Sequence, residues 1–220
     1  MIVAGMTPEQ IRKEILTDLM MIRNKINYPH LRRELIKSHV KVMCRHLEYQ
    51  TRTYNKWFIR VVWSKKAFIF EPVVMYFDHQ GMSAVSIRFD KGKIYLDMYY
   101  THFFKRYRER MHMESLSHEE LFREFFRVNS GMSQLTMNDE ESNEKLTFTL
   151  FVEGVAFGEK ISEEFQFIKT FLPYNMLLPF QLEVVDQMRN SEDGNFTPNP
   201  EWEKMVRSHL NKKHRLNEAA

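Results

Sequence analysis

Residues 101–111 read THFFKRYRERM and carry the side chains of this chain that are best suited to chemistry. In a helix, His102 and Arg106 lie one turn apart on the same side and can act on one group. Imidazole transfers protons near neutral pH, and guanidinium stabilises charge that develops on phosphate oxygens. The pair therefore predicts metal-independent cleavage of RNA in which the 2′-hydroxyl attacks the phosphate. His102 is the predicted acid/base, and Arg106 and Arg110 are the predicted phosphate-stabilising residues.

The same segment also has a structural interpretation. A helix over residues 101–112 places its aromatic side chains and Met111 on the side opposite the charged residues. The aromatic side then packs on a sheet while the charged side faces water. Arg106 and Glu109 form an ordinary helical ion pair in that arrangement. The residues alone leave both interpretations open.

The motif has a counterpart in a known family. It reads His-x-x-x-Arg-Tyr-x-Glu-Arg after a predicted strand, and its residues are His102, Arg106, Tyr107, Glu109 and Arg110. With the capped helix and strands that follow, it resembles the RelE-type toxin endoribonucleases, which share a fold with barnase and the colicin ribonucleases. The resemblance covers about residues 95–175. It implies that the downstream strands form the sheet of that fold, and that this His and Arg are site residues in some members and structural in others.

The positive charge of the chain is concentrated at its N-terminal end. Residues 1–66 contain 14 Lys and Arg against 5 Asp and Glu, a formal charge of +9, whereas residues 67–220 carry −6. Such an asymmetry indicates an anionic partner for the basic part. The alternative is that these residues solvate helices or pair with acidic loops of the same chain.

A helix predicted from Pro29 to about residue 53 gives this charge a pattern. Basic residues recur along it and form a stripe: Arg33, Lys37, Lys41, Arg45 and Arg52. The stripe predicts a surface that binds the phosphate backbone of RNA or DNA. A solvent-facing side of a helix is the alternative interpretation.

Hydrophobic periodicity predicts an α+β fold, in which an N-terminal pair of helices leads into a largely antiparallel sheet covered by helices. Thr7, Pro8 and Gln10 start the first helix with a capping box, and that helix ends before Pro29. Strands are predicted over residues 57–63, 67–77, 82–89, 94–100, 145–153, 155–158 and 164–171. Further helices are predicted over 101–112, 117–128 and 173–189, and an acidic loop over 129–144.

The predicted domain organisation is simple. Residues 1–190 form one α+β domain, with a basic helical part at 1–56 and a sheet-containing part at 57–190. Residues 191–220 begin with a linker containing glycine and proline, and they end in a C-terminal helix or tail. This last segment is a helical appendage to the domain.

Composition excludes several classes of protein. With 43% hydrophobic and 14% aromatic residues the chain is not wholly disordered, and its single cysteine, Cys44, excludes a disulfide scaffold. There is no long apolar run and no secretory signal pattern. No metal-ligand spacing and no cofactor fingerprint appears. We therefore expect no metal site, no cofactor, no membrane partner and a cytoplasmic location.

Taken together, these patterns predict a nucleic-acid-binding protein that resembles metal-independent endoribonucleases, with RNA or DNA as its partner. The alternative is a non-catalytic protein that binds nucleic acid or a protein partner, or that serves in assembly. The first hypothesis depends on His102, and the second does not.

Overall fold

The computed structural model describes residues 1–26, 28–90, 92–129, 133–138 and 145–190. Its helices are α1 (Pro8–Lys25), α2 (Tyr28–Ser38), α3 (Thr101–Arg110), α4 (His118–Val128), the short 3₁₀ helix η1 (Tyr174–Met176) and α5 (Pro179–Asn190). Its strands are β1 (Val42–Gln50), β2 (Lys56–Ser64), β3 (Phe68–Asp78), β4 (Gly81–Asp90), β5 (Lys93–Tyr99), β6 (Ser133–Asn138), β7 (Lys145–Leu150), β8 (Gly154–Lys160) and β9 (Phe165–Pro173). The predicted α+β class is confirmed.

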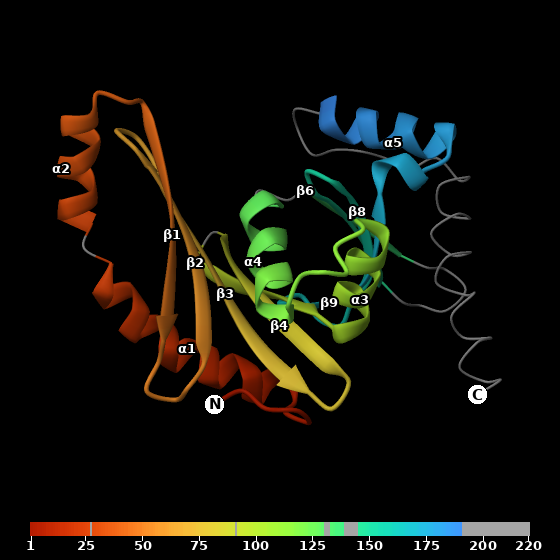
Figure 1. Ribbon diagram of the computed structural model, residues 1–220, viewed down its shortest axis with the longest axis horizontal. Helices are drawn as coiled ribbons and strands as arrows, with labels where there is room; N and C mark the ends of the chain where they lie inside the picture. The colour runs from red at the N-terminus through yellow and green to blue at the C-terminus, as the bar shows by residue number, and fades with distance from the viewer. Residues whose placement is uncertain (27, 91, 130–132, 139–144, 191–220) are drawn as a thin grey trace.

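The described strands form one sheet in the order β1-β2-β3-β4-β5-β9-β8-β7-β6. Strands β1 to β5 are an antiparallel meander, and β9 to β6 are a second antiparallel group. The two groups meet where residues 96–99 of β5 pair in parallel with residues 165–168 of β9. We call β1, β2 and β3 the wing, because Figure 1 shows them extending away from the rest of the sheet.

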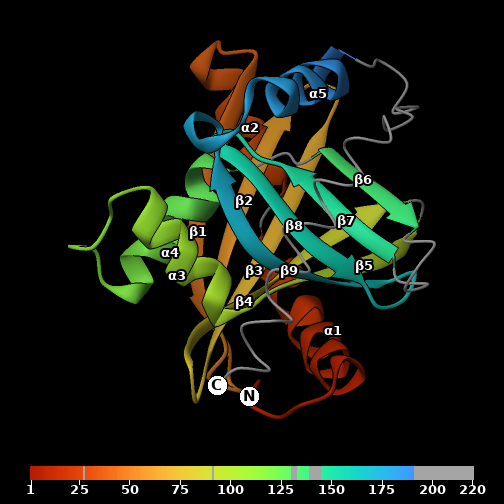
Figure 2. The ribbon, with the colours of Figure 1, turned by 90° about the vertical axis from the view of Figure 1, so that its right-hand side faces the viewer.

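Helices cover the sheet on both faces. Helices α1 and α2 pack on the face of the sheet that carries Trp57 and Trp63. Helices α3 and α4 pack on the opposite face, around Phe58 and Tyr99. Helix α5 covers a third cluster that includes Phe148 of β7. Figure 1 shows α2 beside the wing and α4 in front of the meander, and Figure 2 shows α5 above β6 to β9. The sheet is therefore the layer that positions every helix.

The predicted helix over residues 29–53 is wrong beyond its first third. It begins where expected, but α2 ends at Ser38, and Val42–Gln50 is strand β1. His39 has a φ of 56°, which takes the backbone out of the helix. Each residue of β1 then pairs with β2, from Val42 with Ser64 to Gln50 with Lys56. Pairing with a strong neighbouring strand outweighs the local helical pattern. The predicted basic helical part at 1–56 therefore includes a strand.

The structure tests the loop predicted over residues 129–144 only in part, and it does not test the predicted C-terminal appendage. The loop predicted over residues 129–144 contains strand β6 (Ser133–Asn138), which pairs antiparallel with β7, so that prediction is wrong. The acidic residues 139–144 and the predicted appendage at 191–220 lie outside the described residues.

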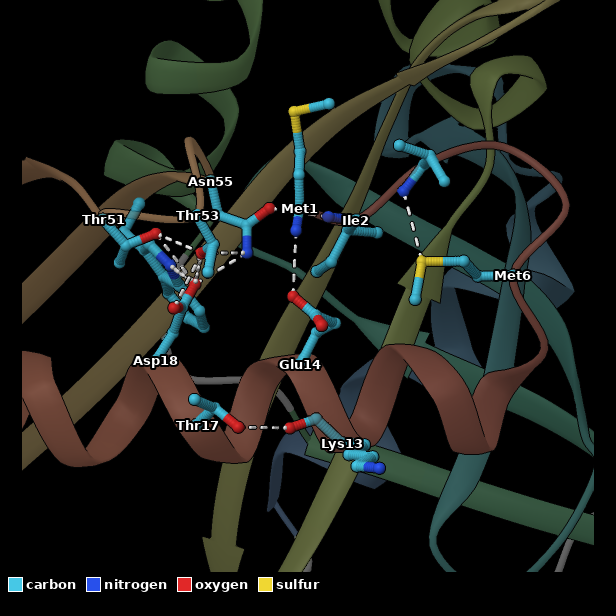
Figure 3. Close-up of polar contacts among 12 residues, drawn as sticks. Met1, Ile2, Met6, Lys13, Glu14, Thr17, Asp18, Thr51, Thr53 and Asn55 are labelled. Carbon is cyan, nitrogen blue, oxygen red and sulfur yellow. Dashed lines mark hydrogen bonds and ion pairs between the residues drawn. The ribbon is translucent and has the colours of Figure 1, made fainter.

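One buried carboxylate fastens α1 to the end of the wing where β1 turns into β2 (Figure 3). Asp18 of α1 is fully buried and accepts hydrogen bonds from the hydroxyls of Thr51 and Thr53 at 3.1 and 3.0 Å. It also accepts from the Asn55 amide at 2.7 Å and from the Trp57 indole at 3.0 Å. A buried charge is stable only with such partners. Asp18 therefore fixes both the turn and the helix that crosses it.

Replacing this carboxylate should destabilise the whole fold. In Asp18→Ala, four donors lose a buried acceptor, and we expect the free energy of unfolding to fall by at least about 3 kcal/mol. Urea denaturation followed by circular dichroism measures the change. Glu14→Ala is the matched control, because Glu14 is partly exposed and pairs only with the N-terminal amine. A midpoint for Asp18→Ala equal to that of the control would contradict the assignment.

Candidate nucleic-acid interface

Helix α3 carries the predicted catalytic residues, and its buried side holds it against the sheet. Phe103, Phe104 and Tyr107 are buried within the cluster shared with α4, as the aromatic side of the motif predicts. At its N-terminus, the Thr101 hydroxyl lies 3.3 Å from a carboxylate oxygen of Asp78, in the β3–β4 turn. The helix therefore presents its charged side outward.

His102 and Arg106 lie together on that charged side. Arg106 Nε donates to His102 Nε2 at 3.4 Å, and Arg106 Nη1 donates to Glu109 at 3.0 Å. The side chains of Arg106 and Glu109 are each 42% exposed. His102 accepts in this contact, which requires an unprotonated Nε2. The sequence prediction that His102 and Arg106 are within reach of each other is confirmed, and Arg106 also forms the predicted ion pair.

Arg110 has a different environment. Its Nη1 donates to the main-chain carbonyl of Phe171 in β9. Burial lowers the pKa of Arg110, and the neighbouring positive charge of Arg106 lowers it further. Arg110 thus connects α3 to β9 through a side-chain to main-chain hydrogen bond.

Tyr107 of the motif also has a structural contact. Its hydroxyl donates to Glu153 at 2.6 Å, and the Asn129 amide donates to the same carboxylate oxygen at 2.7 Å. Burial raises the pKa of Tyr107, and the hydrogen bond to Glu153 raises it further. This contact links α3, the end of α4 and the β7–β8 turn.

The predicted basic stripe is not one surface. Arg33 and Lys37 are on α2, Lys41 precedes β1, and Arg52 lies in the β1–β2 turn at the far end of the strand. Arg45 on β1 pairs with Glu34 at 3.0 Å and lies over the ring of Trp63. The stripe fails because the helix that would align it ends at Ser38.

Two lysines of the predicted stripe lie at one end of the wing, together with two further lysines that the sequence analysis did not single out. Because Val42 pairs with Ser64, the link after α2 and the β2–β3 turn lie at the same end of the wing. Four exposed lysines lie there, and we call them the wing-tip lysines: Lys37, Lys41, Lys65 and Lys66. Within the described part of the chain, none of their ammonium groups has an ion-pair partner. The missed signal is the Lys-Lys pair in a hairpin turn.

A large cleft begins beside the wing tip. It has a volume of about 1150 Å³ and is lined by residues 68–73 of β3 and 86–90 of β4, together with residues of α1, β2, β5 and α4. No residue of α3 lines it. Its lining is largely apolar, with the guanidinium groups of Arg23, Arg60 and Arg88 among the side chains. Arg60 pairs with Glu71 and Arg88 pairs with Asp97, so the cleft mainly suits the apolar surface of a ligand.

The cleft exists because β3 and β4 separate. Their pairing covers only residues 73–78 with 81–86. Pro72 is the first residue of β3 beyond that ladder, and proline has no N–H to donate. Proline in a sheet is found at edges and bulges, and Pro72 lies where the pairing of β3 with β4 ends. Across the gap, the rings of Phe70 and Phe89 lie 6.0 Å apart.

The described residues were also searched for a metal site and for a helix that could cross a membrane. Among the described residues, no three His, Cys, Asp or Glu side chains are close enough to hold a metal ion. No helix in the described ranges is long and apolar enough to cross a membrane.

Comparison with known proteins gives no relative. We found no match to this chain among protein-family models, curated proteins or solved structures. The function of this protein is therefore inferred from the geometry of the chain itself.

Removing the Tyr107 hydroxyl tests whether this motif residue is structural. In Tyr107→Phe, Glu153 loses a buried donor, and we expect the free energy of unfolding to fall by about 1.5 to 3 kcal/mol. Urea denaturation measures the loss. Tyr54→Phe is the control, because Tyr54 is 72% exposed. Stability equal to that of wild type would show that the contact with Glu153 contributes nothing.

Proposed function

We propose that this protein binds nucleic acid through the wing-tip lysines. The observation that carries the proposal is the convergence of Lys37, Lys41, Lys65 and Lys66 at one exposed end of the sheet. Two chain segments more than twenty residues apart contribute to it. Among the described residues, no carboxylate forms an ion pair with these ammonium groups, so they are available to an external anion.

A phosphate backbone suits this surface better than an isolated anion does. Each lysine that contacts a phosphate releases condensed counterions, so several weak contacts add up to useful affinity. Lysine binds phosphate as a point charge and needs no fixed geometry. The tip is therefore adapted to a polymer with regularly spaced charges. The sequence-predicted partner, RNA or DNA, has this chemistry.

Neutralising the wing tip should weaken binding and its dependence on salt. In a variant with all four wing-tip lysines changed to Gln, we expect the slope of log affinity against log salt to fall by about 3, since each phosphate contact contributes about 0.7 to 0.9. Fluorescence anisotropy with labelled RNA and DNA oligonucleotides, measured over a range of salt concentrations, gives the slope.

A charge-matched control uses four exposed lysines on other elements, namely Lys13, Lys25, Lys105 and Lys145. Changed to Gln, they should leave affinity and slope close to those of wild type. Equal losses in the two variants would mean that net charge alone attracts the nucleic acid. Absence of binding by the wild-type protein would leave the protein-binding or assembly alternative.

A second candidate function is RNA cleavage at α3, and the 3.4 Å contact between His102 and Arg106 favours it. In this reaction the Arg106 guanidinium turns from His102 to the phosphate, and Nε2 of His102 then removes the proton of the 2′-hydroxyl while the 2′-oxygen forms a bond to phosphorus. The bond from phosphorus to the 5′-oxygen breaks, the leaving oxygen takes up a proton from water, and His102 returns the proton it accepted to the solvent. Arg106 would stabilise the charge on the other phosphate oxygens. The products are a 2′,3′-cyclic phosphate and a 5′-hydroxyl.

This candidate is tested by RNA cleavage with and without EDTA. A general acid/base contributes about 10²- to 10⁴-fold, so His102→Ala should reduce cleavage by at least about 100-fold while leaving nucleic-acid affinity unchanged. His30→Ala is the control, since His30 lies on α2. No cleavage by a well-folded wild-type protein, or full activity of His102→Ala, would remove the catalytic proposal and leave the binding proposal intact.

A further inference from the structure

The cleft between β3 and β4 opens directly beside the wing tip. Lys65 and Lys66 are in the β2–β3 turn, and the cleft lining begins at Phe68. Phe68 follows Lys65 by three residues and Lys66 by two, so even a fully extended chain would place it at most about 7 to 11 Å from them. That separation is comparable to the distance from a phosphate to the far edge of its own base.

Large apolar side chains at this mouth are exposed to solvent. The side chains of Phe68, Ile69 and Phe89 are 38%, 46% and 49% exposed. All three line the cleft, and Phe89 comes from the strand opposite the other two. Exposed apolar surface gathered in a cleft and bordered by charge is typical of a binding site.

We propose that the nucleic acid bound by this protein is single-stranded, with phosphates on the wing-tip lysines and unpaired bases in the cleft. This inference rests on the proposed function and adds the class of substrate to it. It follows from the adjacency of an unneutralised basic surface and an aromatic cleft, the two components of non-specific single-strand binding sites.

A duplex fits the same surfaces less well. Its bases are stacked and paired inside the helix, so their faces cannot reach the rings of Phe68 and Phe89. A single strand can turn its bases into the cleft, and each base that stacks on an aromatic ring adds affinity. Duplex binding would therefore use the lysines alone.

The first measurement compares the affinities of single-stranded and duplex nucleic acid for the protein. Fluorescence anisotropy at one fixed low salt concentration compares labelled single-stranded RNA, single-stranded DNA and blunt duplexes of the same sequence. We expect at least one single strand to bind about 10-fold or more tightly than either duplex. Duplex binding that is equal or tighter would overturn the inference, and no binding to any of these would overturn the proposed function as well.

Removing the rings is the second measurement. The double variant Phe68→Ala/Phe89→Ala should lose about 10- to 100-fold in single-strand affinity while its salt slope stays that of wild type. Phe68→Leu/Phe89→Leu keeps apolar volume without rings and should show most of the same loss. Phe77→Ala is the matched control, because Phe77 is 50% exposed at the other end of β3 and lies against His118.

The ring and lysine variants separate the two proposals. If the lysine variant loses binding and the ring variants bind as wild type does, the proposed function stands and the single-strand inference is wrong. If Phe77→Ala loses as much affinity as the ring variants, the cleft is not the base-binding site. If the ring variants lose affinity for duplex and single strand equally, stacking on bases is not the cause.

Discussion

The fold depends on the short parallel pairing between β5 and β9, because it joins the two antiparallel groups of strands in the described sheet. Parallel neighbours cannot be joined by a hairpin, so the chain must leave the sheet and return. Here it does so through α3, α4 and strands β6 to β8. The position of the candidate helix α3 is thus a consequence of how this junction is made.

A buried polar network fixes the junction in register. Asp97 of β5 is fully buried, and Arg88 of β4 donates to both of its oxygens at 2.6 and 2.8 Å. Gln166, which lies opposite Asp97 on β9, donates to the same carboxylate, and Gln134 of β6 accepts from Arg88 at 3.0 Å. A one-residue slip would leave a buried charge without partners. The hydrogen bonds of this network therefore connect β4, β5, β6 and β9.

The same network has a consequence for the cleft. Arg88 is held toward β5 by Asp97, so the end of β4 stays with β5, while the beginning of β3 stays paired with β2. Pro72 offers no donor to close the gap between them. The sheet therefore divides at this point, and the wing on one side and the β4–β5 hairpin on the other form the two walls.

The two strands that the sequence failed to predict are the two edges of the sheet. Strand β1 was interpreted as helix and β6 as loop, whereas the predicted strands inside the sheet were found with small shifts at their ends. Inner strands such as β4 and β8 are buried along most of their length, and runs of apolar residues bounded by turn residues predict them. No residue of β1 is fully buried. Its conformation is set by pairing with β2, which local sequence does not encode.

In the candidate site too, contacts within one helix could be predicted from the sequence, and contacts between distant elements could not. The contact of His102 with Arg106 lies within one helix, so spacing alone predicted it. The tie from Arg110 to Phe171 and the bond from Tyr107 to Glu153 join elements far apart in the chain. The meeting of Lys37 and Lys41 with the β2–β3 turn required the register of β1 on β2.

Ion pairing within the described part of the chain decides which basic residues remain available to a partner. Arg45, Arg60 and Arg88 pair with carboxylates of this chain. The planar guanidinium matches a carboxylate in geometry and is weakly hydrated, so arginine is readily used inside the fold. Lysine is compact and strongly hydrated, and the wing-tip lysines stay in solvent. Under the proposed function, attraction for the phosphate backbone would be concentrated at the tip, while the cleft would offer mainly apolar contact. Salt weakens the first contribution and leaves the second, so selectivity for unpaired bases would persist where affinity has fallen.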